Sequence, residues 1–199
     1  MKKIFLSITL LLCLGFTNTI KAQDSFTIAY SIAFPTGDLG NYIDKTSYRG
    51  AVLEYQSFVK PNIGVGFSLG MNTFYEKKNY DTYTNGTVSL SGTQWRYSNH
   101  VPIYITGNYY FKPNSNISPF AGLGIGTIYS RRNTDMYIYT VEEKAWNFGL
   151  QPSIGVLFAT KDFATIHVSA KYNYGFESGN ELDGNQSYIS LNLGFTFEK

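Results

Sequence analysis

Large apolar residues occupy every second position in eight segments of the chain that follow residue 22. The last segment shows the pattern clearly, because Ile189, Leu191, Leu193, Phe195 and Phe197 alternate with Ser190, Asn192, Gly194 and Thr196. A period of two is typical of a β-strand, whose successive side chains point to opposite faces. We name these the heavy face (large apolar residues) and the light face (Gly, Ser, Thr, Ala and Asn). The predicted strands lie within residues 25–34, 49–59, 63–75, 93–111, 118–130, 145–158, 164–175 and 187–199.

The connections between these strands alternate in length. The long ones are residues 36–46, 76–92, 132–144 and 176–186, and the short ones are residues 60–62, 112–117 and 160–162. Such alternation in an antiparallel sheet places all long loops at one end and all short turns at the other. No segment after residue 22 has a helical period, and no linker interrupts the strands. We therefore predict one all-β antiparallel domain, residues 23–199.

The volume of the heavy face decides which face points inward. An even number of antiparallel strands can close into a barrel, and eight strands leave a bore that side chains just fill. Five large residues on each strand, roughly forty in all, exceed that bore. The heavy face must then point outward, where it suits lipid rather than water. A closed barrel also pairs its backbone groups internally, as a bilayer requires. The prediction is an eight-stranded transmembrane β-barrel.

The first 22 residues have the features of a secretory signal peptide. Lys2 and Lys3 precede an apolar run from residue 4 to residue 16, and the small Ala22 marks a cleavage site. The run is shorter than the roughly 20 residues of a membrane-spanning helix, so an N-terminal anchor is the weaker alternative. Cys13, the only cysteine, lies in this segment behind the large Leu12, so we predict neither a lipid anchor nor a disulfide.

Net charge argues against nucleic-acid binding, and composition supports a β-sheet fold. Removal of residues 1–22 takes away three of the 16 basic residues and none of the 14 acidic ones, which leaves 13 against 14. A nearly neutral chain offers no basic face for nucleic acid. The 17 Tyr, 15 Phe and 19 Gly beside only 15% charged residues favour strands over helices.

Four segments resemble a known family. They are GAVLEYQSFVKPNIGVGFSLG (50–70), VPIYITGNYYF (101–111), SPFAGLGIGTIYS (118–130) and LNLGFTFEK (191–199). They look like the outer-membrane protein beta-barrel domain family, which is similar to the small OmpA/OmpX-like barrels of Gram-negative bacteria. The resemblance implies a monomer in the bacterial outer membrane, in contact with outer-membrane lipid and inserted by the barrel-assembly machinery. Both termini would face the periplasm, and the long loops would lie outside.

Six ionisable residues are candidates for an interior network. We assign to the light face Glu54, Arg96, His100, Arg131, His167 and Lys171. Charges enclosed in a narrow barrel need partners, because unpaired burial costs several kcal/mol per ion, roughly. We expect these residues to form a polar network in the lumen that braces the wall and plugs the bore. The alternative is the lining of a small porin-like channel.

The sequence gives little support for catalysis, dinucleotide binding or a metal site. His167 and Ser169 match a His-x-Ser pair of an outer-membrane lipid A deacylase family, but that pair faces lipid, whereas here both residues lie on the light face. The glycines of GLGIG (122–126) recur every second residue in a strand, unlike a dinucleotide loop. With no cysteine left and no clustered ligands, we predict no metal site and no cofactor.

The long loops carry acids and amides, and outer loops are where a barrel of this kind would bind an extracellular partner. We expect an integral outer-membrane protein with a structural or surface-interaction role and no catalysis. Two alternatives remain open, a small pore and a soluble lipocalin-like barrel with its apolar face turned inward around a ligand.

Overall fold

The computed structural model describes residues 24–85, 88–113, 115–160, 164–178, 182 and 184–198. The predicted signal peptide, residues 1–22, lies outside the described residues. The elements are β1 (Asp24–Thr36), α2 (Gly37–Tyr42), β2 (Gly50–Lys60), β3 (Ile63–Asn85), β4 (Val88–Tyr110), β5 (Ile117–Met136), β6 (Tyr139–Phe158), β7 (Ala164–Gly175) and β8 (Gln186–Glu198).

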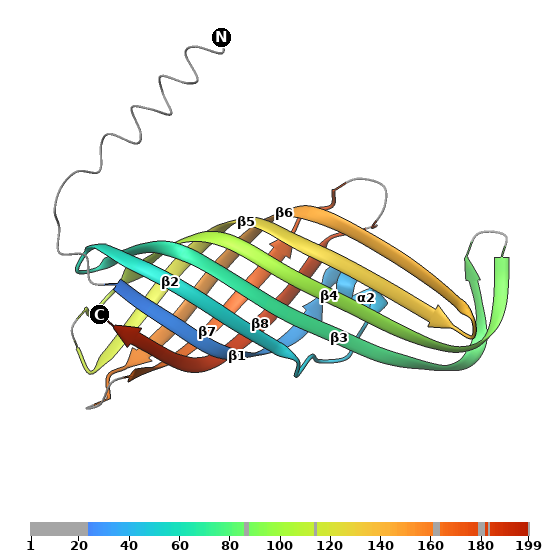
Figure 1. Ribbon diagram of the computed structural model, residues 1–199, viewed down its shortest axis with the longest axis horizontal. Coiled ribbons are helices and arrows are strands. Elements are labelled where there is room, and N and C mark those ends of the chain that lie inside the picture. Colours follow the sequence, from blue (N-terminus) through green and yellow to red (C-terminus); the bar gives the residue numbers. More distant parts are fainter. Residues whose placement is uncertain are drawn as a thin grey trace, which may run out of the picture.

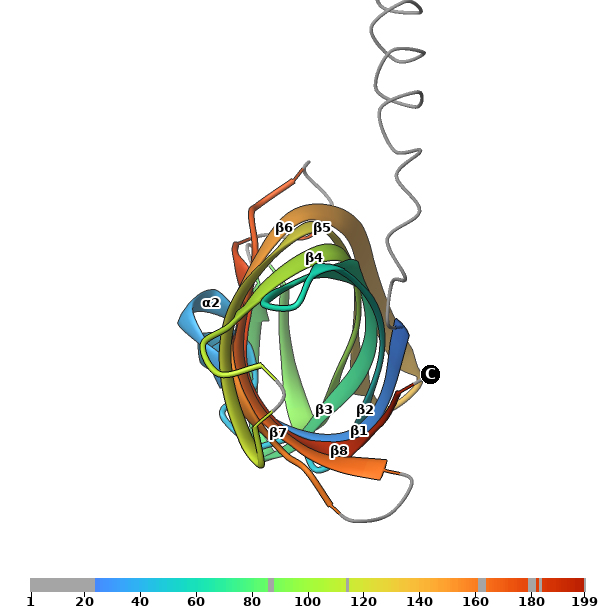
Figure 2. The same ribbon diagram turned by 90° about the vertical axis from the view of Figure 1, so that its left-hand side faces the viewer.

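The eight strands form a closed antiparallel barrel (Figures 1 and 2). Each strand pairs with the next along the chain, and β1 pairs with β8 to complete the ring, from Ser25 opposite Glu198 to Thr36 opposite Ser187. Closure removes the free edges that an open sheet would expose in the wall. The predicted fold class, eight antiparallel strands in a ring, is confirmed.

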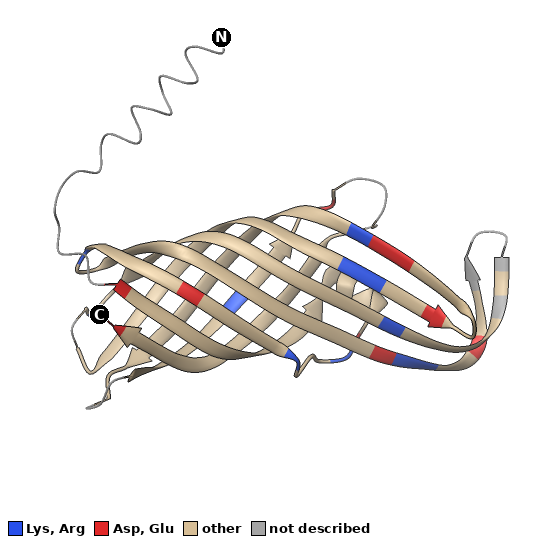
Figure 3. Cartoon of the chain, viewed as in Figure 1, with Lys and Arg blue, Asp and Glu red and all other residues tan. Residues whose placement is uncertain are grey.

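The heavy face points outward. Leu193 is 60% exposed, and Ile125 and Phe195 are also exposed, whereas Asn192 and His100 on the light face are buried. The wall is almost free of charged residues along its middle, and the Lys, Arg, Asp and Glu segments gather toward the ends (Figure 3). A lipocalin-like barrel would have these apolar residues around its axis, so that alternative is wrong.

Four strands continue far beyond the other four. β3, β4, β5 and β6 have 20 to 23 residues, whereas β1, β2, β7 and β8 have 11 to 13. The predicted loops 76–92 and 132–144 are therefore largely strand, and they project from one end of the barrel (Figure 1). The sequence did not show this because backbone pairing continues here through polar residues, such as the Thr82 and Ser91 hydroxyls 2.8 Å apart, without an apolar period.

The first long connection contains the helix α2, where we predicted none. Six residues are too few to show a helical period. Leu39 and Ile43 are fully buried against Phe74 and Tyr188, which point into the lumen from β3 and β8. The connection therefore packs into the barrel at its long-hairpin end. Among the described residues, no helix is long and apolar enough to cross a membrane.

Candidate functional site

The interior contains a buried ion pair that crosses the bore. The Lys171 ammonium on β7 donates a hydrogen bond to the Glu54 carboxylate on β2. The two strands are not neighbours in the ring, so the pair joins separate parts of the wall. His167 Nε2 lies 3.8 Å from the second Glu54 oxygen. All three side chains are buried. Three of the six predicted network residues thus meet at one level of the lumen.

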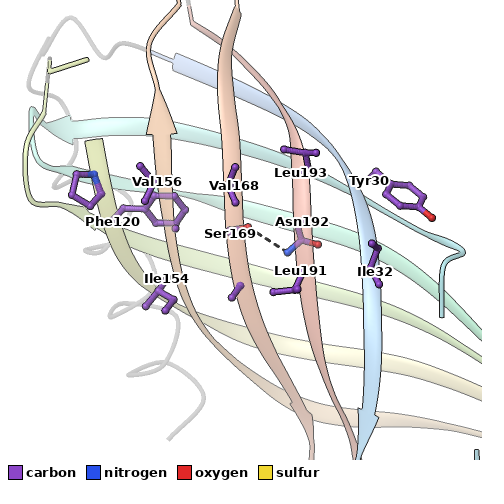
Figure 4. A pocket seen from close by; sticks show the side chains of 13 residues that line it. Tyr30, Ile32, Phe120, Ile154, Val156, Val168, Ser169, Leu191, Asn192 and Leu193 are labelled. Carbon is purple, nitrogen blue, oxygen red and sulfur yellow. Dashed lines mark hydrogen bonds between the residues drawn. The ribbon is translucent and has the colours of Figure 1, made fainter. Parts of the chain in front are cut away.

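The same level includes the His-x-Ser pair. His167 Nε2 lies 3.0 Å from Ser169 Oγ, and Asn192 donates a hydrogen bond of 3.3 Å to that oxygen (Figure 4). A catalytic triad needs the acid on one imidazole nitrogen and the serine on the other. Here Glu54 and Ser169 approach the same nitrogen, and Ser169 is buried. The arrangement suits interior hydrogen bonding rather than activation of a nucleophile.

Large aromatic rings also fill the lumen, and the sequence analysis missed them. Tyr110 and Phe120 pack with Leu157 and Phe58 at the short-turn end, and the Tyr110 hydroxyl donates to Gln56 Oε1 at 2.7 Å. Inward glycines make room for them: a Cβ at Gly155 would lie 2.5 Å from Phe120. The sequence does contain a signal for these rings, because Tyr110 and Phe120 are out of phase with the heavy face of their strands.

His100 lies in a separate level, nearer the long hairpins. Its two ring nitrogens lie 2.8 Å from Ser98 Oγ and 2.9 Å from Ser130 Oγ. The Phe74 and Tyr188 rings are each 5.6 Å away. His100 is thus enclosed by hydroxyls and aromatic rings. It is inside the lumen, as predicted, but it does not join the Glu54 cluster.

Tyr42, at the end of α2, closes the mouth above this level. Two guanidinium groups lie over its ring, with Arg96 Cζ 5.0 Å and Arg132 Cζ 4.6 Å from the ring centre. Arg96 donates to the Tyr42 carbonyl at 2.7 Å, and the Tyr42 hydroxyl is 2.6 Å from the Thr134 hydroxyl. Burial raises the pKa of the Tyr42 phenol, although Thr134 and the two arginines oppose the rise. Tyr42 therefore ties the β1–β2 connection to β4 and β5 across the opening.

Arg131 is not a lumen residue, and its predicted place on the light face is wrong. It is in phase with Ile125 and Tyr129, so it points outward, where it pairs with Glu142 at 2.6 Å. The adjacent Arg132 is the arginine that points inward. The error was one of phase, since a strand that continues past Ser130 carries its odd residues outward.

The outer wall bears a shallow apolar depression on β6, β7, β8 and β1 (Figure 4). Its outward side chains include Ile154, Val168, Leu191 and Leu193, with Ala170 between them. Tyr30 also lines it, and its hydroxyl donates to the Tyr48 carbonyl. The surface is suited to hydrocarbon chains. Within the described residues, no group of three or more His, Cys, Asp or Glu side chains could hold a metal ion.

A closed eight-stranded barrel with an apolar outside and a filled polar inside is the architecture of small outer-membrane barrels. The chain has this fold, and the resemblance seen in the sequence is confirmed at that level. No family model and no curated protein matches the chain.

Solved structures of such barrels do match. OprG from Pseudomonas aeruginosa is 12% identical over 89% of this chain and 96% of its own, with a TM-score of 0.58. Ail of Yersinia pestis, crystallised with the heparin analogue sucrose octasulfate, is 17% identical over 88% and 99%, with a TM-score of 0.53. The outer membrane protease OmpT from Escherichia coli is 9% identical over 94% and 99%, with a TM-score of 0.50. These similarities concern the fold.

Proposed function

We propose that the mature chain is an integral protein of the bacterial outer membrane with a structural and surface-interaction role and no catalysis. In this proposal residues 1–22 direct export and are removed, and the barrel-assembly machinery inserts the barrel as a monomer. The long hairpins face outward and the short turns face the periplasm. Two features support this proposal. The exposed apolar wall is suited to contact with lipid, and the buried Glu54–Lys171 pair braces the interior.

The observation that carries the interaction role is the sheet that β3 to β6 form past the end of the barrel. Pairing of β2 with β3 reaches Asn72, and pairing of β6 with β7 begins at Gly149. Among the described residues, 76–85 of β3 pair only with β4 and 139–147 of β6 pair only with β5, so each presents one sheet edge without a partner strand. Such edges and their loops are natural binding surfaces. The exposed Tyr80, Tyr137, Ile138 and Tyr139 add apolar contact area.

Shortening the β3–β4 hairpin should abolish binding while the barrel still folds. Lys78 lies opposite Gln94, so Asn-Gly in place of residues 79–93 closes the hairpin as a two-residue turn. We expect bacteria that display the intact protein to adhere to immobilised matrix proteins or sulfated glycans, and the shortened form to adhere at the level of cells without the protein. Retention of cells under flow measures this. The sulfated probe is chosen because Ail was crystallised with a heparin analogue.

A folded and surface-exposed variant is required for this comparison. Heat-modifiable gel migration reports folding, and an antibody against an inserted epitope in the 176–186 loop reports display. Equal adhesion of the intact and shortened proteins would reject the hairpin as the binding surface. Adhesion of the intact protein no greater than that of control cells on every surface would reject the interaction role.

We expect the lumen to be closed to ions. The Glu54–Lys171 pair crosses the bore, rings of Phe120 and Tyr110 fill the short-turn end, and Tyr42 lies across the other end. The purified barrel in a planar bilayer should give no stepwise conductance at neutral pH, while a general porin added to the same bilayer gives steps. Reproducible ion-selective steps from the inserted barrel would favour the porin-like alternative.

A further inference from the structure

Three outward-facing cations lie just past an aromatic row at the long-hairpin end of the wall. The aromatic row consists of Tyr75, Tyr97, Tyr129 and Trp146, with Tyr75 and Tyr97 packed at 5.0 Å and Tyr129 and Trp146 at 5.0 Å. Lys77 and Arg131 come two residues after Tyr75 and Tyr129, and Lys144 comes two residues before Trp146. Each cation is thus on the same face as its aromatic residue, on the side away from the barrel. Figure 3 shows that Lys and Arg, together with Asp and Glu, gather at this end of β3 to β6.

The position of this row fixes its surroundings. In outer-membrane barrels aromatic girdles mark the boundary between the hydrocarbon and the polar headgroups. Two residues along a strand correspond to about 6.6 Å, so the cations lie within the headgroup layer. Lys77 Nζ is 5.9 Å from the centre of the Trp95 ring, which keeps this ammonium against the wall.

The charges in this row are not balanced within the protein. Arg131 and Lys144 are directly opposite each other on neighbouring strands and face the same side. Like charges in that position destabilise a sheet. Glu142 pairs with Arg131 at 2.6 Å, but neither Lys144 nor Lys77 forms an ion pair with any described residue. An anion between these strands would relieve the repulsion.

We propose that Lys77, Arg131 and Lys144 bind the phosphate groups of an anionic glycolipid in the outer leaflet. The inference rests on the proposed insertion in the outer membrane and assigns a ligand to its outer rim. A guanidinium can hold a phosphate through two parallel hydrogen bonds, and the ammonium groups add point charges. Glu142 competes with the phosphate for Arg131, so it limits the affinity.

The chain carries its own reporters for this site. Trp95 and Trp146 are its two tryptophans, and they lie beside Lys77 and two residues from Lys144. The signal-free protein is folded into phosphatidylcholine nanodiscs, and lipid A or enzymatically dephosphorylated lipid A is titrated in while tryptophan emission is followed. We expect a saturable change with lipid A and at least tenfold weaker binding of the dephosphorylated form.

Matched variants test the assignment to these residues. R131Q/K144Q should weaken lipid A binding at least tenfold, and E142Q should bind at least as tightly as the parent. K112Q removes an exposed lysine from a short turn at the other end and should leave the affinity unchanged. Heat-modifiable migration confirms that each variant is folded.

Four results would overturn the proposal. They are equal binding of the two lipids, an unaffected R131Q/K144Q, an equal loss in K112Q, and stronger binding of soluble heparin than of lipid A, which would assign the row to a soluble polyanion. Failure of the protein to float with phosphatidylcholine vesicles would instead reject membrane insertion itself. The two failures are thus distinguishable.

Discussion

Replacement of Lys171 by Met is expected to lower the free energy of unfolding by about 3–5 kcal/mol. The change leaves the buried Glu54 carboxylate without the ammonium to which it is bonded. Burial of an unpaired charge is far more costly than the pair is stabilising, because desolvation of the remaining ion is no longer offset. Reversible unfolding in urea, followed by tryptophan emission in lipid vesicles, gives the difference.

Removal of both charges should restore most of the stability. The double variant E54L/K171M leaves neither member of this ion pair in the lumen, and apolar replacement of a buried pair is often neutral. Lys112→Met, which alters an exposed lysine, serves as the control and should change stability by less than about 0.5 kcal/mol. If K171M were as mild as K112M, the pair would not be buried, and water would reach this level of the lumen.

The phase of the strands explains why so much of the fold was predictable from sequence. Alternation of large and small residues gave the strand number, the antiparallel order and the outward direction of Leu193 and Phe195. The outward direction depends on one physical constraint, since the bore cannot hold the heavy face. The antiparallel order was supported in addition by the alternating lengths of the connections.

What could not be predicted depends on contacts between distant residues. The α2 helix is stabilised because Leu39 and Ile43 are buried against Phe74 and Tyr188. No local sequence pattern indicates that contact. The hairpin extensions mix polar residues with scattered apolar ones, so the apolar period stops although strand pairing continues. Arg131 was misplaced for the same reason. The apolar pattern ends at Ser130, but the strand continues with odd-numbered residues outward and even-numbered ones, such as Arg132, inward.

The interior was predicted as polar, and that was incomplete rather than wrong. Glu54, His167 and Lys171 meet as a network would, but rings such as Tyr104 and Phe120 share the space. Glycines in the same row of nearby strands accommodate them: a Cβ at Gly149 would lie 2.8 Å from the Tyr104 hydroxyl. Pairing an inward aromatic with its facing glycine requires the register between strands, which the sequence of one strand does not contain.

Replacement of Leu193 by Arg tests the outward orientation of the heavy face directly. Leu193 lies opposite Tyr30 and Val168, halfway along β8, on the wall that bears the apolar depression. An arginine at the midplane of the lipid face destabilises an outer-membrane barrel by about 2–4 kcal/mol. We expect a loss of that size in vesicle-reconstituted protein.

The matched control is the same substitution at Val141, which is exposed on the extension of β6 beyond the aromatic row. There the arginine meets water, so the expected change is within about 0.5 kcal/mol. The difference between the two variants isolates the contribution of lipid from that of strand propensity, because both are exposed aliphatic residues within a strand. Val141 has the inward phase of Asn147, but it lies beyond the closed ring, where its side chain meets water and not lipid. Equal, small effects at both positions would mean that Leu193 does not contact hydrocarbon, and the membrane orientation would have to be abandoned.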